Sequence, residues 1–131
     1  MEPKWGIPAV ALFIMNIKKR SKYRNVRTEY SGLHFHSKAE AARAKTLDMM
    51  VHGGLVEFWL PQVKFRLGVP ENVYIVDFLV VGKDGIRAED VKGKETTKFR
   101  HDKRLWRAYG PCPLWIVKVG KIEVIDPNDS Q

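Results

Sequence analysis

Hydrophobic residues along the chain form short blocks separated by turn residues. The longest block in the middle of the chain, Val73 to Val81, is apolar throughout except for Asp77. Such a run is typical of a central strand covered on both faces. Ile86 to Lys92 predicts the next strand, and Gly82-Lys83-Asp84-Gly85 predicts a tight turn between the two. We therefore expect a hairpin at the centre of the fold.

Shorter blocks of apolar or alternating residues predict further strands, bounded by glycine and proline. Proline at position 61 is expected to break one region into two strands. In chain order these segments are a small hairpin or turn at Thr28 to Phe35, strands at Val56 to Leu60 and Gln62 to Leu67, a buried strand at Leu114 to Val119, and a short strand at Ile122 to Ile125.

Two segments show helix boundaries. Ser37 with Glu40 three residues later forms a capping box, which predicts a helix that reaches about His52 and stops at Gly53-Gly54. We expect its apolar face to contain five residues at helical spacing: Ala39, Ala42, Thr46, Met49 and Met50.

A second helix is expected to begin after Thr96 or Thr97 and to reach about Tyr109. Gly110-Pro111-Cys112-Pro113 ends it. The resulting order is a helix, three strands or four, a helix and a strand. This order predicts an α/β fold in which a central mixed β-sheet is flanked by helices.

The composition fits one soluble domain with a nucleic acid partner. The chain has 131 residues, of which 44% are hydrophobic, and carries a net charge of +8 with a pI of about 9.7. This charge favours a polyanion, with nucleic acid ahead of an anionic membrane. The lone Cys112 fits a reducing compartment. The apolar stretch Ile7 to Ile14 is too short to span a membrane.

The chain divides into three parts. We interpret residues 1–21 as an N-terminal extension that is basic at its end, residues 22–125 as a single domain, and residues 126–131 as a frayed tail. Met15 is a possible alternative start, which would make residues 1–14 dispensable.

The central hairpin is expected to gather charged residues on one face. The hairpin can close through a two-residue loop at either of two places in the turn. One loop places Asp77 opposite Asp90, and the other places Asp77 opposite Lys92. Residues two apart on a strand share a face, so either position brings all three together. A three-residue loop would instead bring Glu89 and Val91 to that face.

Two close carboxylates repel each other unless a cation lies between them. Mg²⁺ or Mn²⁺ is the natural cation, since it takes one or two carboxylates together with water and phosphate oxygens. The backbone carbonyl of Val91 is a possible further ligand. Lys92 is suited to orient a water molecule and to offset charge on phosphorus. Asp77, Asp90 and Lys92 thus predict a metal-dependent phosphodiesterase site.

This pattern, preceded by a helix that bears Glu40, resembles the PD-(D/E)XK nuclease superfamily. The likeness is nearest to small phage-encoded nucleases and archaeal-type Holliday junction resolvases, and it covers about residues 22–120. Val76 stands where the motif name has proline. The segments that carry the resemblance are Lys22-Tyr23-Arg24-Asn25, Ser37-Lys38-Ala39-Glu40-Ala41, Tyr74-Ile75-Val76-Asp77-Phe78 and Glu89-Asp90-Val91-Lys92-Gly93.

The resemblance implies a restriction-endonuclease-like core and a Mg²⁺-dependent, structure-selective DNA endonuclease, first of all a Holliday junction resolvase. Glu40 would be an additional metal ligand and catalytic residue. Paired symmetric nicks imply a homodimer, for which Trp59, Trp106, Trp115 and the segment Ile7 to Ile14 are candidate contacts. The implied location is the cytoplasm of a bacterial or archaeal host.

Two basic clusters are expected to contact the DNA backbone, and neither shows a base-reading pattern, so we expect recognition of shape. One lies before the first strand and the other on the second helix. Their members are Lys18, Lys19, Arg20, Lys22 and Arg24, and Lys98, Arg100, Lys103, Arg104 and Arg107.

Several simpler interpretations stay open. Asp77 could be a buried acid satisfied by an arginine or by backbone amides, and capping alone explains Glu40. Glu89 is expected to point to the other face of the sheet. His34 and His36 share a strand face but lack a complete zinc ligand set. The alternative functions are another PD-(D/E)XK endonuclease, acting on flaps, nicks or duplexes, and a non-catalytic DNA-binding protein.

Overall fold

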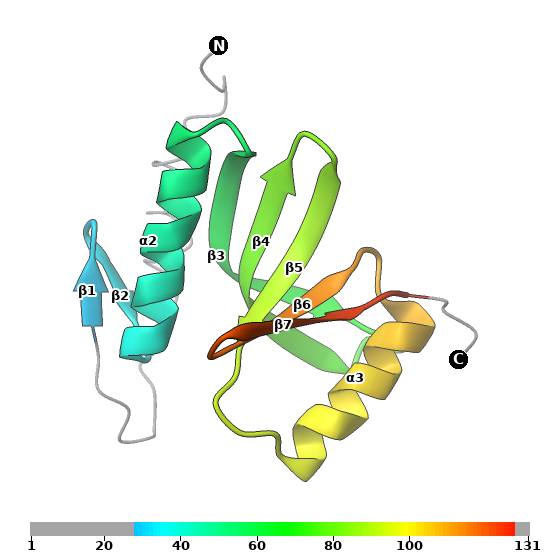
Figure 1. Cartoon of the computed structure of the whole chain (residues 1–131). Helices are drawn as coiled ribbons and strands as arrows, with labels where there is room; N and C mark the ends of the chain where they lie inside the picture. Colours follow the sequence, from blue (N-terminus) through cyan, green and yellow to red (C-terminus); the bar gives the residue numbers. More distant parts are fainter. Residues whose placement is uncertain (1–27, 128–131) are drawn as a thin grey trace.

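The computed structural model describes residues 28–127 (Figure 1). The elements confirm the predicted order of strands and helices, and they begin with the small hairpin expected before the first helix. In chain order they are β1 (Thr28–Tyr30), β2 (Leu33–Phe35), α2 (Lys38–His52), β3 (Val56–Arg66), β4 (Val73–Gly82), β5 (Gly85–Val91), α3 (Thr97–Tyr109), β6 (Leu114–Lys118) and β7 (Lys121–Ile125).

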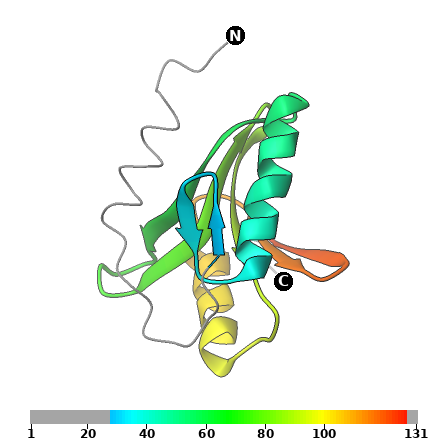
Figure 2. The same ribbon diagram turned by 90° about the vertical axis from the view of Figure 1, so that its left-hand side faces the viewer.

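A five-stranded mixed sheet has the order β3-β4-β5-β6-β7. Neighbouring strands are antiparallel except β5 and β6, which are parallel. Parallel neighbours need a crossover connection, and α3 supplies it. β1 and β2 form a separate two-stranded sheet beside α2 (Figures 1 and 2). The predicted α/β class is confirmed, with a mixed sheet and two helices among residues 28–127.

The helix α2 packs on the sheet with a different face from the one expected. Ser37 caps it as predicted, but its buried residues are Ala41, Ala44 and Leu47. These pack with Phe78 of β4 in one core cluster. The predicted face of Ala39, Ala42, Thr46, Met49 and Met50 is wrong, because Met49 is 66% exposed. Alanine occurs on both stripes of this helix, so Leu47 decides which stripe is buried.

Asp48 fixes α2 to the elements on either side of it. Its carboxylate accepts hydrogen bonds from the Tyr30 hydroxyl at 2.6 Å and from the Trp59 indole nitrogen at 2.8 Å. The bond to Asp48 and burial raise the pKa of Tyr30 to about 12. Trp59 is therefore buried core rather than a dimer contact, and that interpretation is wrong.

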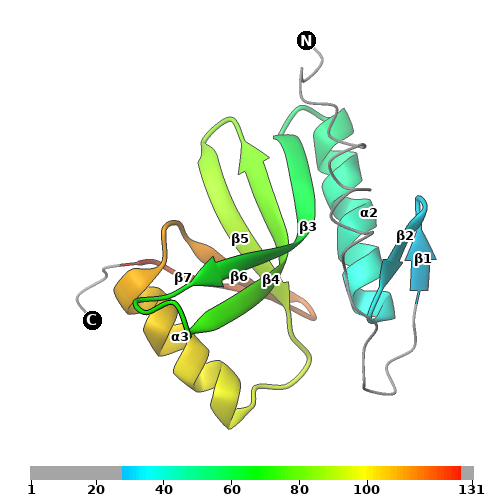
Figure 3. The ribbon, with the colours of Figure 1, turned by 180° about the vertical axis from the view of Figure 1, so that it is seen from behind.

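The second helix builds a separate core cluster, well apart from α2 (Figures 1 and 3). Trp106 is fully buried, and its ring meets the rings of Phe65 and Tyr74 edge-on. Its indole nitrogen donates to the Cys112 carbonyl at 2.7 Å. A Cβ at Gly110 would lie 2.5 Å from the Trp106 ring, so only glycine fits there. Trp106 is also excluded as a surface contact.

Two expectations about the strands are wrong. Pro61 does not break β3, which runs without interruption from Val56 to Arg66. β3 is an edge strand of the sheet, where proline is tolerated. The next residue, Gln62, has a φ of +55° in the left-handed region without interrupting the strand. β4 is buried on one face only, because Val73 and Ile75 are exposed.

Among the described residues, no helix has the length and apolarity needed to cross a membrane. The basic residues Lys18, Lys19, Arg20, Lys22 and Arg24, the Ile7 to Ile14 segment and most of the predicted tail lie outside residues 28–127.

Candidate active site

The register of the central hairpin is one of the two that were predicted. The ladder between β4 and β5 runs from Gly82 opposite Gly85 to Phe78 opposite Glu89, with a two-residue loop. The next position in this register holds Asp77 and Asp90. The sequence interpretation that brings the two acids together is therefore confirmed.

At Asp77 and Asp90, side chains take over the hydrogen bonding between the two strands. The Asp77 amide donates to Asp90 Oδ1 at 2.8 Å, and the Val91 amide donates to Asp77 Oδ2 at 2.9 Å. One residue further, the Lys92 amide donates to the Val117 carbonyl of β6 at 3.0 Å. The carboxylates thus satisfy backbone amides where β5 leaves β4 for β6.

The charged form of the two carboxylates is electrostatically unfavourable at this place. Burial, the Asp90 charge and the Glu40 charge raise the pKa of Asp77 well above its usual range. Burial also raises the pKa of Asp90, which the Lys92 charge and the Tyr74 hydroxyl partly oppose. Both acids therefore hold their protons more tightly than exposed aspartates do. A bound cation would relieve this cost.

Lys92 lies beside the acids, as predicted. Its Nζ is 3.4 Å from Asp90 Oδ2 and 4.6 Å from the centre of the Phe99 ring. About a third of its side chain is exposed. The ammonium thus borders both buried Asp90 and solvent, where a substrate phosphate would have to approach.

Tyr74 is a site residue that sequence reasoning missed. Its hydroxyl donates to Asp90 Oδ2, the same oxygen that Lys92 approaches. Burial and the nearby Asp90 charge raise the pKa of Tyr74, so the phenol stays protonated as a donor. The only signal in the sequence was that a buried tyrosine needs a partner for its hydroxyl, and this does not identify the partner.

Glu40 serves both as a helix cap and as a neighbour of the site. Its amide donates to Ser37 Oγ at 3.2 Å, which confirms half of the capping box. Its carboxylate accepts from the His36 amide at 3.3 Å rather than from Ser37. The negative charge of Glu40 also raises the pKa of Asp77. The first helix therefore brings a third carboxylate toward the pair.

Glu89 faces away from the acid pair, as expected. It is fully buried, and its carboxylate accepts from Arg43 Nε of α2 and Arg87 Nε of β5, both at 2.7 Å. A second bond from Arg43 measures 3.0 Å. This bidentate pair ties α2 to β5 and so helps to hold Glu40 near Asp77.

The residues at the site suit a hard divalent cation by their chemistry. Asp77, Asp90, Glu40 and the carbonyl of Val91 are all oxygen donors, which Mg²⁺ and Mn²⁺ prefer. Burial raises the pKa of both aspartates, and the nearby Asp90 and Glu40 charges raise that of Asp77 further, so a cation at the pair would be favoured. Within residues 28–127, however, no three His, Cys, Asp or Glu side chains already converge as a metal site.

The basic residues of α3 divide into two groups. Arg100, Arg104 and Arg107 are exposed at helical spacing on one face. Lys98 is also exposed and pairs with Asp102 at 2.9 Å.

Lys103, by contrast, is largely covered. Its ammonium lies 2.9 Å from Glu95 and 3.5 Å from Glu123, and Lys118 joins the same ion-pair network. Hydrogen bonds from Lys103 and Lys118 lower the pKa of Glu95. The structure therefore gives Lys103 a role in joining α3 to β7, and we do not include it in the DNA surface.

Replacing Asp77 with Asn should stabilise the protein at pH 7. The pKa of Asp77 is raised on folding, so the folded state binds more protons and wild-type stability falls as pH rises above the unfolded pKa of about 3.9. The amide oxygen can still accept from the Val91 amide. Thermal unfolding from pH 4 to pH 7 should show a gain in Tm that grows with pH.

Asp84→Asn in the exposed hairpin loop is the matched control and should show no such gain. A Tm difference for Asp77→Asn that is zero or negative at every pH would contradict the electrostatic description of the pair.

A family model described as "Protein of unknown function (DUF1064)" matches residues 20–124 of the chain. No curated protein and no solved structure gives a significant match. The matched range contains Glu40, Asp77, Asp90 and Lys92. The whole candidate site therefore lies within the part of the chain that the family model describes.

Proposed function

The chain belongs to the DUF1064 family, and from its site we propose a Mg²⁺-dependent, structure-selective DNA endonuclease, first of all a Holliday junction resolvase. One observation carries the proposal: Asp77 and Asp90 lie together at the point where the pairing of β4 with β5 ends, with Lys92 beside them. Acids and a lysine so placed match the requirements of phosphodiester hydrolysis.

The order of elements supports a restriction-endonuclease-like core. A helix precedes a three-stranded antiparallel unit, and a crossover helix then leads to a strand parallel to β5. The acid pair lies on the second and third strands of this unit, β4 and β5, and Glu40 lies on the preceding helix. Both placements are those that the resemblance implies for a nuclease of this superfamily.

Each residue of the site has a proposed role. Asp77, Asp90 and Glu40, with the carbonyl of Val91, would hold Mg²⁺ or Mn²⁺. When bound, the ion supplies Lewis-acid polarisation of the phosphate and a more acidic water. Lys92 orients the attacking water and offsets charge on the phosphoryl oxygens. Tyr74 is a positioning residue, because its hydroxyl holds Asp90 Oδ2.

The charge distribution supports DNA as the substrate. The net charge is +8, and Arg100, Arg104 and Arg107 present guanidinium groups on one exposed face of α3. Arginines without a base-reading arrangement contact phosphates and fix orientation rather than sequence. The basic residues from Lys18 to Arg24 would add to this grip.

A homodimer is part of the proposal, because two symmetric cuts require two sites related by symmetry. Of the three tryptophans first considered for the interface, Trp115 alone is partly exposed. It carries the Arg87 guanidinium 3.9 Å from its ring centre.

A non-catalytic DNA-binding protein is the second candidate, and one observation favours it. Each carboxylate of the pair accepts a hydrogen bond from a backbone amide. These bonds alone give both side chains a structural role. In that case the pair would serve only to end the β4–β5 ladder.

A cleavage panel separates the candidates. The wild-type protein with Mg²⁺ should place paired symmetric nicks in a labelled four-way junction and leave a linear duplex of the same sequence intact. Preferred cutting of a flap or a linear duplex would replace the resolvase by another endonuclease. Binding to all of these DNAs without cutting any would favour the non-catalytic candidate.

A further inference from the structure

Beyond the acid pair, β3 and β4 continue as a two-stranded ribbon. Their ladder runs on to Val73, whereas β5 pairs with β4 only as far as Phe78. We call residues 62–66 of β3 and residues 73–77 of β4 the β3–β4 ribbon. Because Asp77 belongs to the ribbon, one end of the ribbon is the candidate active site.

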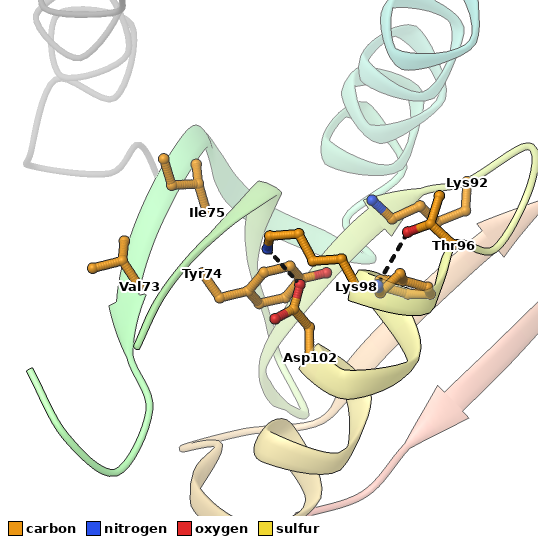
Figure 4. Close-up of a pocket in the computed structure, with 8 residues that line it drawn as sticks. Val73, Tyr74, Ile75, Lys92, Thr96, Lys98 and Asp102 are labelled. Atoms are coloured by element: carbon orange, nitrogen blue, oxygen red, sulfur yellow. Dashed lines mark hydrogen bonds and ion pairs between the residues drawn. The ribbon is translucent and has the colours of Figure 1, made fainter. Parts of the chain in front are cut away.

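One face of the ribbon packs against α3. The rings of Phe65 and Tyr74 meet the Trp106 ring edge-on, with ring centres 5.1 Å and 5.9 Å apart. Figure 4 shows Tyr74 directed toward α3, whereas Val73 and Ile75 project from the other side of β4. The second face of the ribbon therefore points away from α3.

This second face carries two cations beside two aliphatic side chains. Lys64 lies opposite Ile75 and Arg66 lies opposite Val73, and directly opposed residues share a face of the sheet. All four residues are exposed, Val73 by 38% and Ile75 by 48%. We call these four residues the open face of the ribbon. It is an apolar strip with a positive charge at each step.

The charges of the open face are available to a ligand. Arg66 Nη1 donates to the Pro70 carbonyl at 2.6 Å, which leaves other donors of the guanidinium group for a second partner. Within residues 28–127, neither Lys64 nor Arg66 forms an ion pair with a carboxylate. Exposed cations that no acid neutralises are suited to bind phosphate oxygens.

The two cations also follow the direction that leads away from the acid pair. Asp77 comes two residues after Ile75, and Ile75 is paired with Lys64. At about 3.3 Å per residue, the level of Lys64 is about 7 Å from Asp77 along the ribbon, and the level of Arg66 is about 13 Å from it. A DNA strand that continues from Asp77 along the ribbon therefore meets both cations in turn.

We propose that the open face binds a duplex arm of the DNA whose scissile phosphate lies at the acid pair. Lys64 and Arg66 hold phosphates of this arm, and Val73 and Ile75 lie against its sugars. A two-stranded ribbon is narrow enough to follow a groove of the duplex. The inference rests on the proposed function and deepens it, because it adds phosphate contacts on the side of the ribbon that faces away from α3.

The test is the double variant Lys64→Ala/Arg66→Ala in the full-length protein. Binding to a labelled four-way junction is followed by fluorescence anisotropy in EDTA at several salt concentrations. Each lost phosphate contact lowers the slope of log affinity against log salt by about one, so the slope should fall by about two. At a fixed salt concentration the Kd should rise by about tenfold or more, the scale of a lost hydrogen bond between charged groups.

Lys83→Ala/Lys121→Ala is the matched control, because it removes the same two positive charges from exposed positions beside two other hairpin turns. Its Kd should stay within about twofold of wild type and its slope should not change. A third variant, Lys64→Arg/Arg66→Lys, keeps both charges and should keep the wild-type slope. All of these side chains are exposed, so the Tm of each variant should stay close to that of wild type.

The outcomes separate the two proposals. If Lys64→Ala/Arg66→Ala binds the junction with the wild-type Kd and slope, the inference about the open face fails, and cleavage by wild type still supports the nuclease. An equal fall of the slope in the control would also overturn it, since total charge alone would then explain the loss. If wild type binds DNA through the open face but cuts none in Mg²⁺, the nuclease function fails and the binding surface stands.

Discussion

Replacing Asp77 with Asn is expected to lower the rate of DNA cleavage by about 10²–10³-fold or more, the usual cost of losing one electrostatic contributor to a transition state. Asparagine keeps the size of the side chain and the bond from the Val91 amide, which measures 2.9 Å in wild type. It removes the charge that a divalent cation needs. Cleavage assays under single-turnover conditions with Mg²⁺ measure the change.

The affinity of the same variant for DNA should be unchanged, because the proposed contacts to the DNA backbone come from basic side chains, such as the arginines of α3, and not from Asp77. Asp84→Asn, in the exposed loop of the hairpin, controls for the chemical change and should cleave at the wild-type rate. Wild-type cleavage by Asp77→Asn would remove the basis for a metal site at the pair.

Removing the carboxylate of Glu89 should have the largest effect on stability. Glu89 is fully buried between Arg43 and Arg87, each 2.7 Å away. Glu89→Ala leaves two guanidinium groups facing each other in a largely covered place, which costs about 3–5 kcal/mol of unfolding free energy. Urea denaturation followed by circular dichroism gives the difference.

Glu57→Ala on the exposed side of β3 is the control and should change stability by less than about 0.5 kcal/mol. A loss below about 1 kcal/mol for Glu89→Ala would show that the ion pair between α2 and β5 does not hold the fold. The position of Glu40 near Asp77 would then need another explanation.

Local signals in the sequence were sufficient for the elements and for the centre of the site. Serine and threonine caps, paired glycines and a short turn are decided by a few neighbouring residues, and α2, α3 and the β4–β5 hairpin appear where these predict. The hairpin also limited the register to two solutions that share one face. Asp77, Asp90 and Lys92 were brought together on that basis, and their proximity is confirmed.

Features that depend on distant packing were beyond the sequence. The buried stripe of α2 was assigned to Met49 instead of Leu47, because both stripes carry alanine and only the sheet decides between them. Pro61 looked like a strand break, since nothing local shows that β3 is an edge strand. The bond from Tyr74 to Asp90 joins residues on different strands and has no local signature.

The exposure of Val73 and Ile75 shows the same limit. An apolar run interrupted only by Asp77 predicts cover on both faces, but whether another element covers the second face has no local signal in the sequence. α3 packs on the face of β4 that carries Tyr74, and Val73 and Ile75 lie on the other face, which stays exposed.

The central claim is that the acid pair is a metal-dependent phosphodiesterase centre acting on branched DNA. Incubation of the wild-type protein with an end-labelled four-way junction, once with Mg²⁺ and once with EDTA, tests it most directly. We predict paired symmetric nicks with Mg²⁺ and none with EDTA. An intact junction in Mg²⁺, or equal cutting with EDTA, would contradict the claim.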